Sequence, residues 1–144
     1  MITDIHTNAS FQDGISMKKD ELIDYVRDRY SVDPEYPWDD DSFIFRHGSN
    51  RKWFAVAMTV PYRRLGIEKE GTADIIDTKC GPLLMDVYRK QPGVLPGYHM
   101  NKDNWVTILL DGTAEAETIK ELLEISYEMT KVKGNHNKSR RRGL

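Results

Sequence analysis

The sequence predicts an α+β fold, a two-layer sandwich in which an antiparallel sheet of about five strands carries helices on one side. Helical periodicity recurs three times, and strand-like runs fill the intervals between the helical segments. The strands follow one another through short turns, which favours antiparallel pairing. With 144 residues, of which 39% are hydrophobic and 31% charged, the chain is long enough for one hydrophobic core.

Three regions follow from the composition. Residues 1–15 have no periodicity and end in an Asp-Gly pair, so we expect a loose leader. A single α+β domain is expected over residues 16–133. Residues 134–144 are basic and polar, and we expect a disordered tail.

The N-terminus lacks the basic start and apolar block of a signal peptide. No apolar run approaches the roughly 20 residues that span a bilayer. The single cysteine, Cys80, excludes an intrachain disulfide and, just before a helix, is either a thiol with a lowered pKa or, as we favour, a small buried hydrophobe. We therefore expect a cytoplasmic location and no membrane partner.

The first helix is predicted from about Met17 to Tyr30, with Ser16 as its cap. Leu22, Val26 and Tyr30 recur every four residues and form its apolar side. The prolines of the segment 33–37 then end the helix, because each disfavours helical geometry in the preceding residue.

Three strands are predicted next, at 42–47, 51–60 and 72–79, the first two joined by a Gly-Ser-Asn turn. Successive side chains of a strand alternate between the two faces of the sheet. Phe43 and Phe45 therefore share a face, whereas the neighbours Trp53 and Phe54 must diverge. One member of that pair is expected outside the main core.

Three adjacent acids, Asp39 to Asp41, could hold a hard cation such as magnesium or form a solvated acidic turn. Neighbouring side chains in extended backbone seldom converge on one ion. We therefore expect no metal, and the sequence indicates no other cofactor.

A second helix is predicted to begin at Pro82 and to stop before the Pro92-Gly93 pair. Its expected buried side consists of Leu83, Leu84, Val87 and Tyr88. A hairpin with polar residues at its tip follows and leads into a buried strand that starts at Trp105.

The segment 111–113 is expected to turn the chain and to cap a final helix, which should end at Gly134. The buried face of that helix is predicted from the spacing of its apolar and small residues. These are Ile119, Leu122, Leu123, Ser126 and the pair Met129-Thr130.

The segment Pro96-Gly97-Tyr98-His99-Met100-Asn101-Lys102, followed by Trp105, resembles the signature of the MmcQ/YjbR family of small bacterial proteins. We call residues 96–102 the signature turn. Four further segments match the family in the right order: Tyr36-Pro37-Trp38, Lys52-Trp53-Phe54-Ala55, Thr78-Lys79-Cys80 and Ser126-Tyr127. Asn104 departs from the family, which usually has histidine there. The resemblance independently implies an antiparallel sheet with helices on one side, similar to secretion-chaperone-like folds, and the double-wing architecture for which the family is described as DNA-binding.

The net charge of −2 conceals an asymmetry. The segment 131–144 holds six basic residues and no acid, which leaves 15 basic and 23 acidic side chains elsewhere. The rest of the chain is therefore too acidic to attract a polyanion over its whole surface. Any nucleic acid must therefore meet local basic patches.

The first functional hypothesis is weak, largely sequence-independent DNA binding through basic loop ends, with the tail arginines as a non-specific clamp. The candidate contacts share a position at or near predicted turns. They are Arg46, Arg51, Lys52, Arg63, Arg64 and Lys102, and the basic hairpin tip also contains His47.

The second hypothesis is a small-ligand site at the signature turn. Its candidate residues supply an imidazole and donors suited to an anion: Lys79, Tyr98, His99, Asn101, Lys102 and Trp105. The alternative is a structural corner in which the aromatic residues pack and the polar ones bond to the turn backbone. No nucleophile with an adjacent base is visible, so no catalytic residue is assigned and an enzyme is not expected.

The third hypothesis is a protein-interaction module. A sheet face without helices would then be covered by another protein or by a second copy of the chain.

Overall fold

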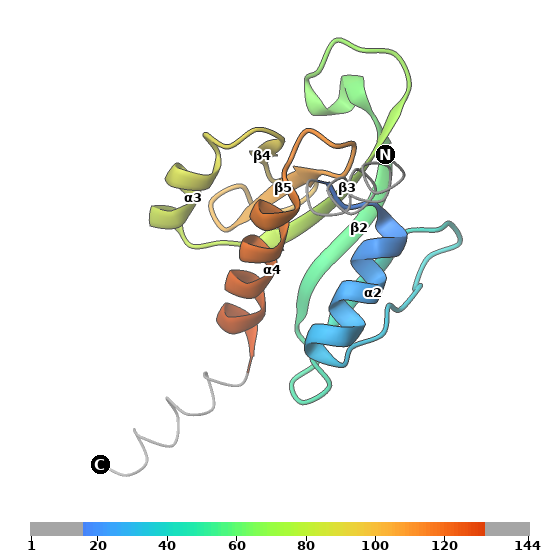
Figure 1. Cartoon of the computed structure of the whole chain (residues 1–144), viewed down its shortest axis with the longest axis vertical. Helices are drawn as coiled ribbons and strands as arrows, with labels where there is room; N and C mark the ends of the chain where they lie inside the picture. Colours follow the sequence, from blue (N-terminus) through green and yellow to red (C-terminus); the bar gives the residue numbers. More distant parts are fainter. Residues whose placement is uncertain (1–15, 132–144) are drawn as a thin grey trace, which may run out of the picture.

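The computed structural model describes residues 16–131 and confirms the predicted fold class, with a five-stranded antiparallel sheet backed by helices (Figure 1). The elements follow in the order α2 (Lys19–Tyr30), β1 (Phe43–Arg46), β2 (Trp53–Pro61), the 3-10 helix η1 (Tyr62–Leu65), β3 (Thr72–Lys79), α3 (Pro82–Tyr88), β4 (Val94–Pro96), β5 (Trp105–Leu109) and α4 (Ala116–Thr130). The sheet order is β1-β2-β3-β5-β4.

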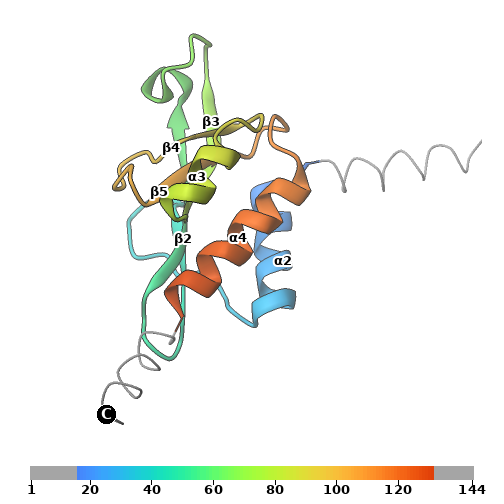
Figure 2. The same ribbon diagram turned by 90° about the vertical axis from the view of Figure 1, so that its left-hand side faces the viewer.

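Figure 2 shows α2 and α4 on one face of the sheet, while the turn between β4 and β5 extends from the other face. The main core fills the helix side. Its strand residues obey the period of two, as in Ile76, Val106 and Ile108. A smaller core around Val60, Ile75 and Leu109 lies on the opposite face, where residues of the signature turn and of the loop after β2 pack against it.

A β-bulge separates Trp53 from Phe54. The pairing of β1 with β2 shifts between Phe45 and Arg46, so that Arg46 pairs with Trp53 while Phe45 pairs with Ala55. The extra residue turns Phe54 into the main core, where it is fully buried beside Ala55, whereas Trp53 is half-buried and packs against Trp38. The predicted divergence of the two aromatics is confirmed.

Both edges of the sheet are short or covered. Glu35 forms an isolated bridge with Ile44 along the outer side of β1. At the other edge, β4 has three residues and ends in Pro96.

Both predicted N-terminal helix caps are wrong. Helix α2 begins at Lys19 with Lys18 as its N-cap, and the carboxylate of Glu21 accepts the Lys18 backbone N–H at 2.8 Å. Glu21, the third residue of the helix, thus satisfies the N–H of the N-cap, and the N-cap is Lys18 and not Ser16. Before α4, Glu115 is the N-cap, and Asp111 instead closes its own turn by accepting the N–H of Thr113.

The predicted buried side of the second helix is also wrong. Leu83, Leu84 and Val87 are 85%, 45% and 56% exposed, whereas Met85 reaches the core and Tyr88 is half-buried. Helix α3 has only two turns and lies beside β4 at one end of the sheet (Figure 1), so a narrow face of it meets the core. In α4 the predicted face is confirmed except for Met129, which is 37% exposed, and Gly134 lies outside the described residues.

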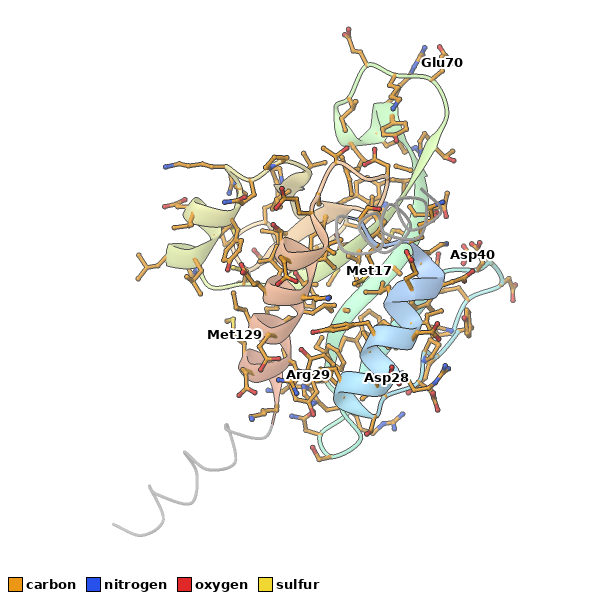
Figure 3. All side chains as sticks on the ribbon, viewed as in Figure 1. Met17, Asp28, Arg29, Asp40, Glu70 and Met129 are labelled. Atoms are coloured by element: carbon orange, nitrogen blue, oxygen red, sulfur yellow. The ribbon has the colours of Figure 1, made fainter. Side chains whose placement is uncertain are left out.

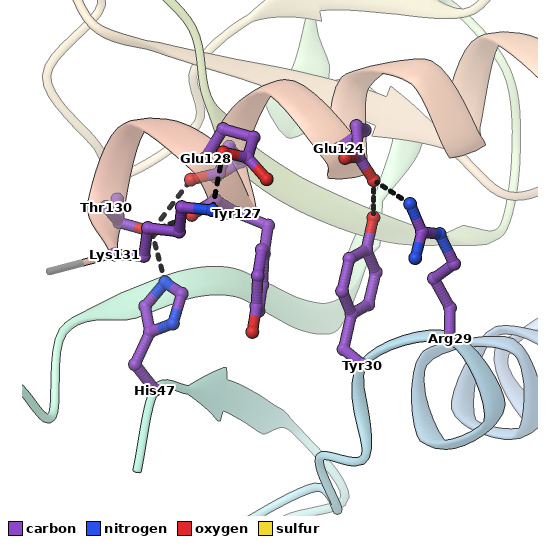
Figure 4. Close-up of polar contacts among 9 residues, drawn as sticks. Arg29, Tyr30, His47, Glu124, Tyr127, Glu128, Thr130 and Lys131 are labelled. Atoms are coloured by element: carbon purple, nitrogen blue, oxygen red, sulfur yellow. Dashed lines mark hydrogen bonds and ion pairs between the residues drawn. The ribbon is translucent and has the colours of Figure 1, made fainter. Parts of the chain in front are cut away.

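The β1–β2 hairpin is held to the end of α4 by His47 (Figure 4). Its imidazole lies 2.8 Å from the Thr130 hydroxyl, and the nearby Asn50 amide donates to the Thr130 carbonyl at 2.8 Å. Burial lowers the pKa of His47. His47 is therefore a neutral structural residue, which corrects its assignment to a basic hairpin tip.

Candidate functional site

The structure separates the predicted nucleic-acid contacts into two groups at opposite ends of the molecule. In Figure 1 the β1–β2 hairpin forms one end, and the loop that contains η1 forms the other. Arg51 and Lys52 lie exposed at the hairpin, whereas Arg63 and Arg64 lie exposed in and around η1. A single ligand site cannot include both groups, which rules out one continuous basic patch.

Two of the predicted contacts are paired with carboxylates. Arg46 is half-buried and lies 3.1 Å from Glu35, and Arg63 lies 3.1 Å from Glu70. Figure 3 places Glu70 at the tip of the loop after β2. A paired guanidinium attracts a further anion less strongly, so these two positions lose weight as phosphate contacts.

A hollow of about 610 Å³ lies within that loop, but it has no net charge to attract an anion. Its charged lining residues are Arg63, Lys69, Glu68 and Glu70, two of each sign.

Arg64 and Lys102 converge, although 38 positions separate them in the sequence. Both line a hollow of about 170 Å³ whose other walls are Leu65, Leu95, Pro96, Gly97 and Tyr98. Within residues 16–131 neither cation forms an ion pair; the ammonium of Lys102 donates to the Gly97 carbonyl at 3.2 Å. We call this place the signature hollow.

The signature turn owes its shape to close backbone packing. Gly97 lies against the Trp105 backbone, and a Cβ there would come within 2.8 Å of the Trp105 carbonyl oxygen. His99 has the left-handed φ of 62°. Its exposed ring lies 4.1 Å from that of Tyr98, centroid to centroid. A left-handed histidine is sparsely populated backbone, of the kind that clusters at ligand-binding turns.

The remaining turn residues are structural. The Asn101 side chain accepts the N–H of Asp103 at 2.8 Å, and the Asn101 carbonyl accepts that of Trp105 at 2.9 Å. Lys79 pairs with Trp105 across β3 and β5, and its side chain makes no hydrogen bond or ion pair with the turn among the described residues. The predicted site therefore reduces to Tyr98, His99 and Lys102, with Arg64 added.

A buried carboxyl lies beneath the signature turn on the same sheet face. Asp77 is fully buried in the middle of β3, opposite Thr107 of β5. The Thr107 hydroxyl donates to Oδ1 of Asp77 and accepts the N–H of Tyr98 at 2.7 Å. Oδ2 of Asp77 has no hydrogen-bond partner among residues 16–131.

Burial raises the pKa of Asp77 to about 7, against the opposing effects of Thr107, the Tyr98 N–H and the Lys102 ammonium. Sequence reasoning missed this residue. The local pattern gives little signal, because Asp74, Thr78 and Lys79 of the same strand are also polar and nothing distinguishes the buried acid from them.

The sequence also suggested a reactive thiol at Cys80 and a cation site at Asp39 to Asp41, and the structure supports neither. Cys80 is fully buried, and burial raises the pKa of its thiol, which keeps it protonated. The acids after Trp38 bind different partners: Asp40 accepts the N–H of Ser42, and Asp41 lies 3.6 Å from Lys19. Among residues 16–131 no group of three or more His, Cys, Asp or Glu residues could hold a metal ion, and no helix there could cross a membrane.

A first prediction concerns the pH dependence of stability. The pKa of Asp77 lies near 3.8 in the unfolded chain and about 7 in the fold, so its neutral form stabilises the fold below about pH 4 and that contribution is lost as the pH rises to about 7. Asp77→Asn should remove this loss, which is of the order of a few kcal/mol. The melting temperature of the variant, measured by thermal unfolding between about pH 5 and pH 8, should therefore depend less on pH than that of the wild type.

His47 also has a shifted pKa, so it too affects how stability depends on pH. Its lowered pKa destabilises the fold only as the pH falls below about 6.5, which is the opposite direction. Because both proteins contain His47, its contribution cancels in their difference, which isolates Asp77 between about pH 4 and pH 7. Equal slopes for the two proteins would contradict the assignment.

Comparison with known proteins gives consistent relatives. The model of the YjbR family matches residues 27–129. Uncharacterized protein YyaQ of Bacillus subtilis (strain 168) is 35% identical over 117 residues, which cover 80% of this chain and 99% of YyaQ. A crystal structure of a Pseudomonas syringae protein is 40% identical with a TM-score of 0.76, and covers 80% of this chain and 100% of its own. The Deinococcus radiodurans protein DR2400 is 28% identical with a TM-score of 0.61, over 82% of this chain and 81% of its own.

Proposed function

This chain belongs to the YjbR family, and we propose that it binds nucleic acid weakly and without sequence preference, through phosphate contacts at the signature hollow. One observation supports this above the others: Arg64 and Lys102, two cations that form no ion pair among the described residues, line the same small hollow. A cytoplasmic location, where the chain meets DNA, is part of the proposal.

The size of the hollow favours a phosphate group over a whole metabolite. Its volume of about 170 Å³ falls below the roughly 300 Å³ at which pockets for small molecules begin. A hollow of this size can hold one phosphate group, and the rest of the ligand must lie outside. A polymer with repeating phosphates meets that requirement, and its bases need not be recognised.

The acidic body restricts where such a polymer can lie. Counterion release from a few phosphates gives weak binding that falls steeply with salt. We propose that the end of the molecule with η1 makes the principal contact. In a double-wing arrangement Arg51 and Lys52, at the other end, would meet a separate part of the polymer.

The test is a fluorescence-anisotropy titration of labelled single- and double-stranded DNA of about 20 nucleotides with the full chain at low ionic strength. We expect a Kd between about 1 and 100 µM at physiological salt, as is typical of non-specific binding, and tighter binding at low ionic strength. Arg64→Glu with Lys102→Glu should weaken binding tenfold or more and should reduce the dependence of log Kd on log salt by about two phosphate contacts.

A matched control lies in the same loop. Arg63→Glu with Lys69→Glu changes the net charge equally, but Arg63 pairs with Glu70, and Lys69 lies over the Tyr62 ring at 4.7 Å from its centroid. This control should weaken binding much less. Equal losses in both double variants, or no binding at low salt, would contradict the proposal. Failure to bind DNA combined with capture of a second copy or another protein at this face would favour the interaction module instead.

A further inference from the structure

Asp77 connects the centre of the sheet to the signature turn by a chain of hydrogen bonds. The Thr107 hydroxyl has one proton, and it donates that proton to Asp77. It can therefore accept the N–H of Tyr98 in a fixed direction. Tyr98 and Gly97 form part of the wall of the signature hollow, so Asp77 orients that wall through Thr107.

The surroundings of Asp77 contain one effective positive charge. Its neighbours across the sheet are Val56 on β2 and Thr107 on β5, both uncharged. Lys79 lies two residues along the same strand and does not contribute to the shifted pKa, whereas Lys102 does. The signature turn also contains His99, whose side chain is exposed.

We propose that Asp77 is a positioning residue of the anion site, which holds the signature turn in place through Thr107 and whose charge determines how strongly Lys102 attracts a phosphate. This inference rests on the proposed function, because the phosphate is the ligand that Lys102 would bind. It goes beyond that function by assigning a proton-linked residue outside the hollow.

The direction of the effect follows from electrostatics. While Asp77 is neutral, the ammonium of Lys102 forms no ion pair among residues 16–131 and donates only to the Gly97 carbonyl. Once Asp77 is ionised, the carboxylate and the phosphate share one ammonium and repel each other in a poorly solvated place. A bound phosphate must therefore favour the protonated form of Asp77, and by linkage the affinity falls as the pH rises through neutrality.

The experiment measures DNA affinity of the full chain at about pH 6 and pH 8 and constant salt. DNA is a suitable probe because its phosphodiesters keep their charge over this range. Wild type should bind about threefold to tenfold more weakly at the higher pH, which corresponds to a shift of between half and one pKa unit in Asp77 on binding. Asp77→Asn should remove most of that difference.

A second measurement does not depend on DNA binding. The backbone amide shifts of Tyr98 and Thr107 should titrate in wild type with a midpoint near that of Asp77, and the titration should vanish in Asp77→Asn. Sulfate, an anion whose charge is constant in this range, should move the midpoint upward. Thr107→Val should abolish the response of Tyr98, and Thr107→Ser should restore it.

The outcomes separate the two claims. DNA binding with the same pH dependence in wild type and Asp77→Asn would overturn the role of Asp77 and leave the proposed function standing. Absence of DNA binding, with amide titrations and a sulfate response that require Asp77, would overturn nucleic-acid binding and support the role of Asp77 in an anion site. Amide shifts of Tyr98 that ignore Asp77 would overturn the inference whatever DNA does.

Discussion

Gly93→Ala should cost about 3 kcal/mol or more of unfolding free energy. Gly93 has the left-handed φ of 80°, and a Cβ there would lie 2.6 Å from the backbone nitrogen and 2.7 Å from the Cβ of Ala114. The contacting atoms of Ala114 are backbone atoms and its Cβ, so no side-chain rotation can relieve the contact. Backbone strain and steric overlap therefore add.

The measurement is urea denaturation followed by circular dichroism, and two other glycines separate the causes. Gly112 also has a positive φ, 98°, but a Cβ there meets nothing within 4 Å, so Gly112→Ala should cost about 1 kcal/mol from strain alone. Gly97→Ala tests overlap without a positive φ. A cost at Gly93 no larger than at Gly112 would show that the close approach to Ala114 relaxes freely.

Ser126→Ala should destabilise the fold by about 2 to 5 kcal/mol, because it leaves two buried backbone groups without partners. The Ser126 hydroxyl donates to the Phe54 carbonyl at 2.6 Å and accepts the Lys79 N–H at 2.8 Å. These groups belong to β2 and β3 just beyond the last paired residues, where the bulge at Phe54 interrupts the ladder. The Ser126 side chain of α4 thus bridges β2 and β3 where the backbone pairing between them ends.

Chemical denaturation and amide hydrogen exchange together check this prediction. The Lys79 amide should lose protection in Ser126→Ala beyond what the global change in stability explains. Thr118→Val is the matched control, since it removes another buried hydroxyl from the same helix that bridges no strands. A loss of unfolding free energy below about 1 kcal/mol in Ser126→Ala would contradict the prediction. It would mean that the Phe54 carbonyl and the Lys79 N–H form a hydrogen bond with each other or with water in the variant.

The sequence was sufficient for features that depend on local periodicity. The strand predicted at 72–79 coincides with β3, and the separation of Trp53 from the main core that holds Phe54 was expected from their adjacency, although the bulge was not. It failed for α3, because helical spacing shows which leucines share a side but not whether any element covers that side. It also misplaced both helix caps, where several nearby polar side chains compete for one terminus.

The candidate site depended on information that local patterns do not contain. Arg64 and Lys102 meet only because β5 inserts between β3 and β4, an order that periodicity cannot supply. Pairing with Glu35 and Glu70 likewise weakened Arg46 and Arg63 as candidates through contacts across loops. Family resemblance identified the signature turn, and the coordinates divided it into structural residues and residues available to a ligand.

The covered outer side of β1 and the proline at the end of β4 have a consequence for self-association. Neither edge strand offers a long row of unpaired backbone N–H and C=O groups to a strand from another molecule. Fibril growth and dimers that form by edge-to-edge strand pairing are therefore disfavoured. Assemblies of this protein should therefore form through side-chain contacts. Mutations that break the bridge between Glu35 and Ile44 should make the protein more prone to precipitate.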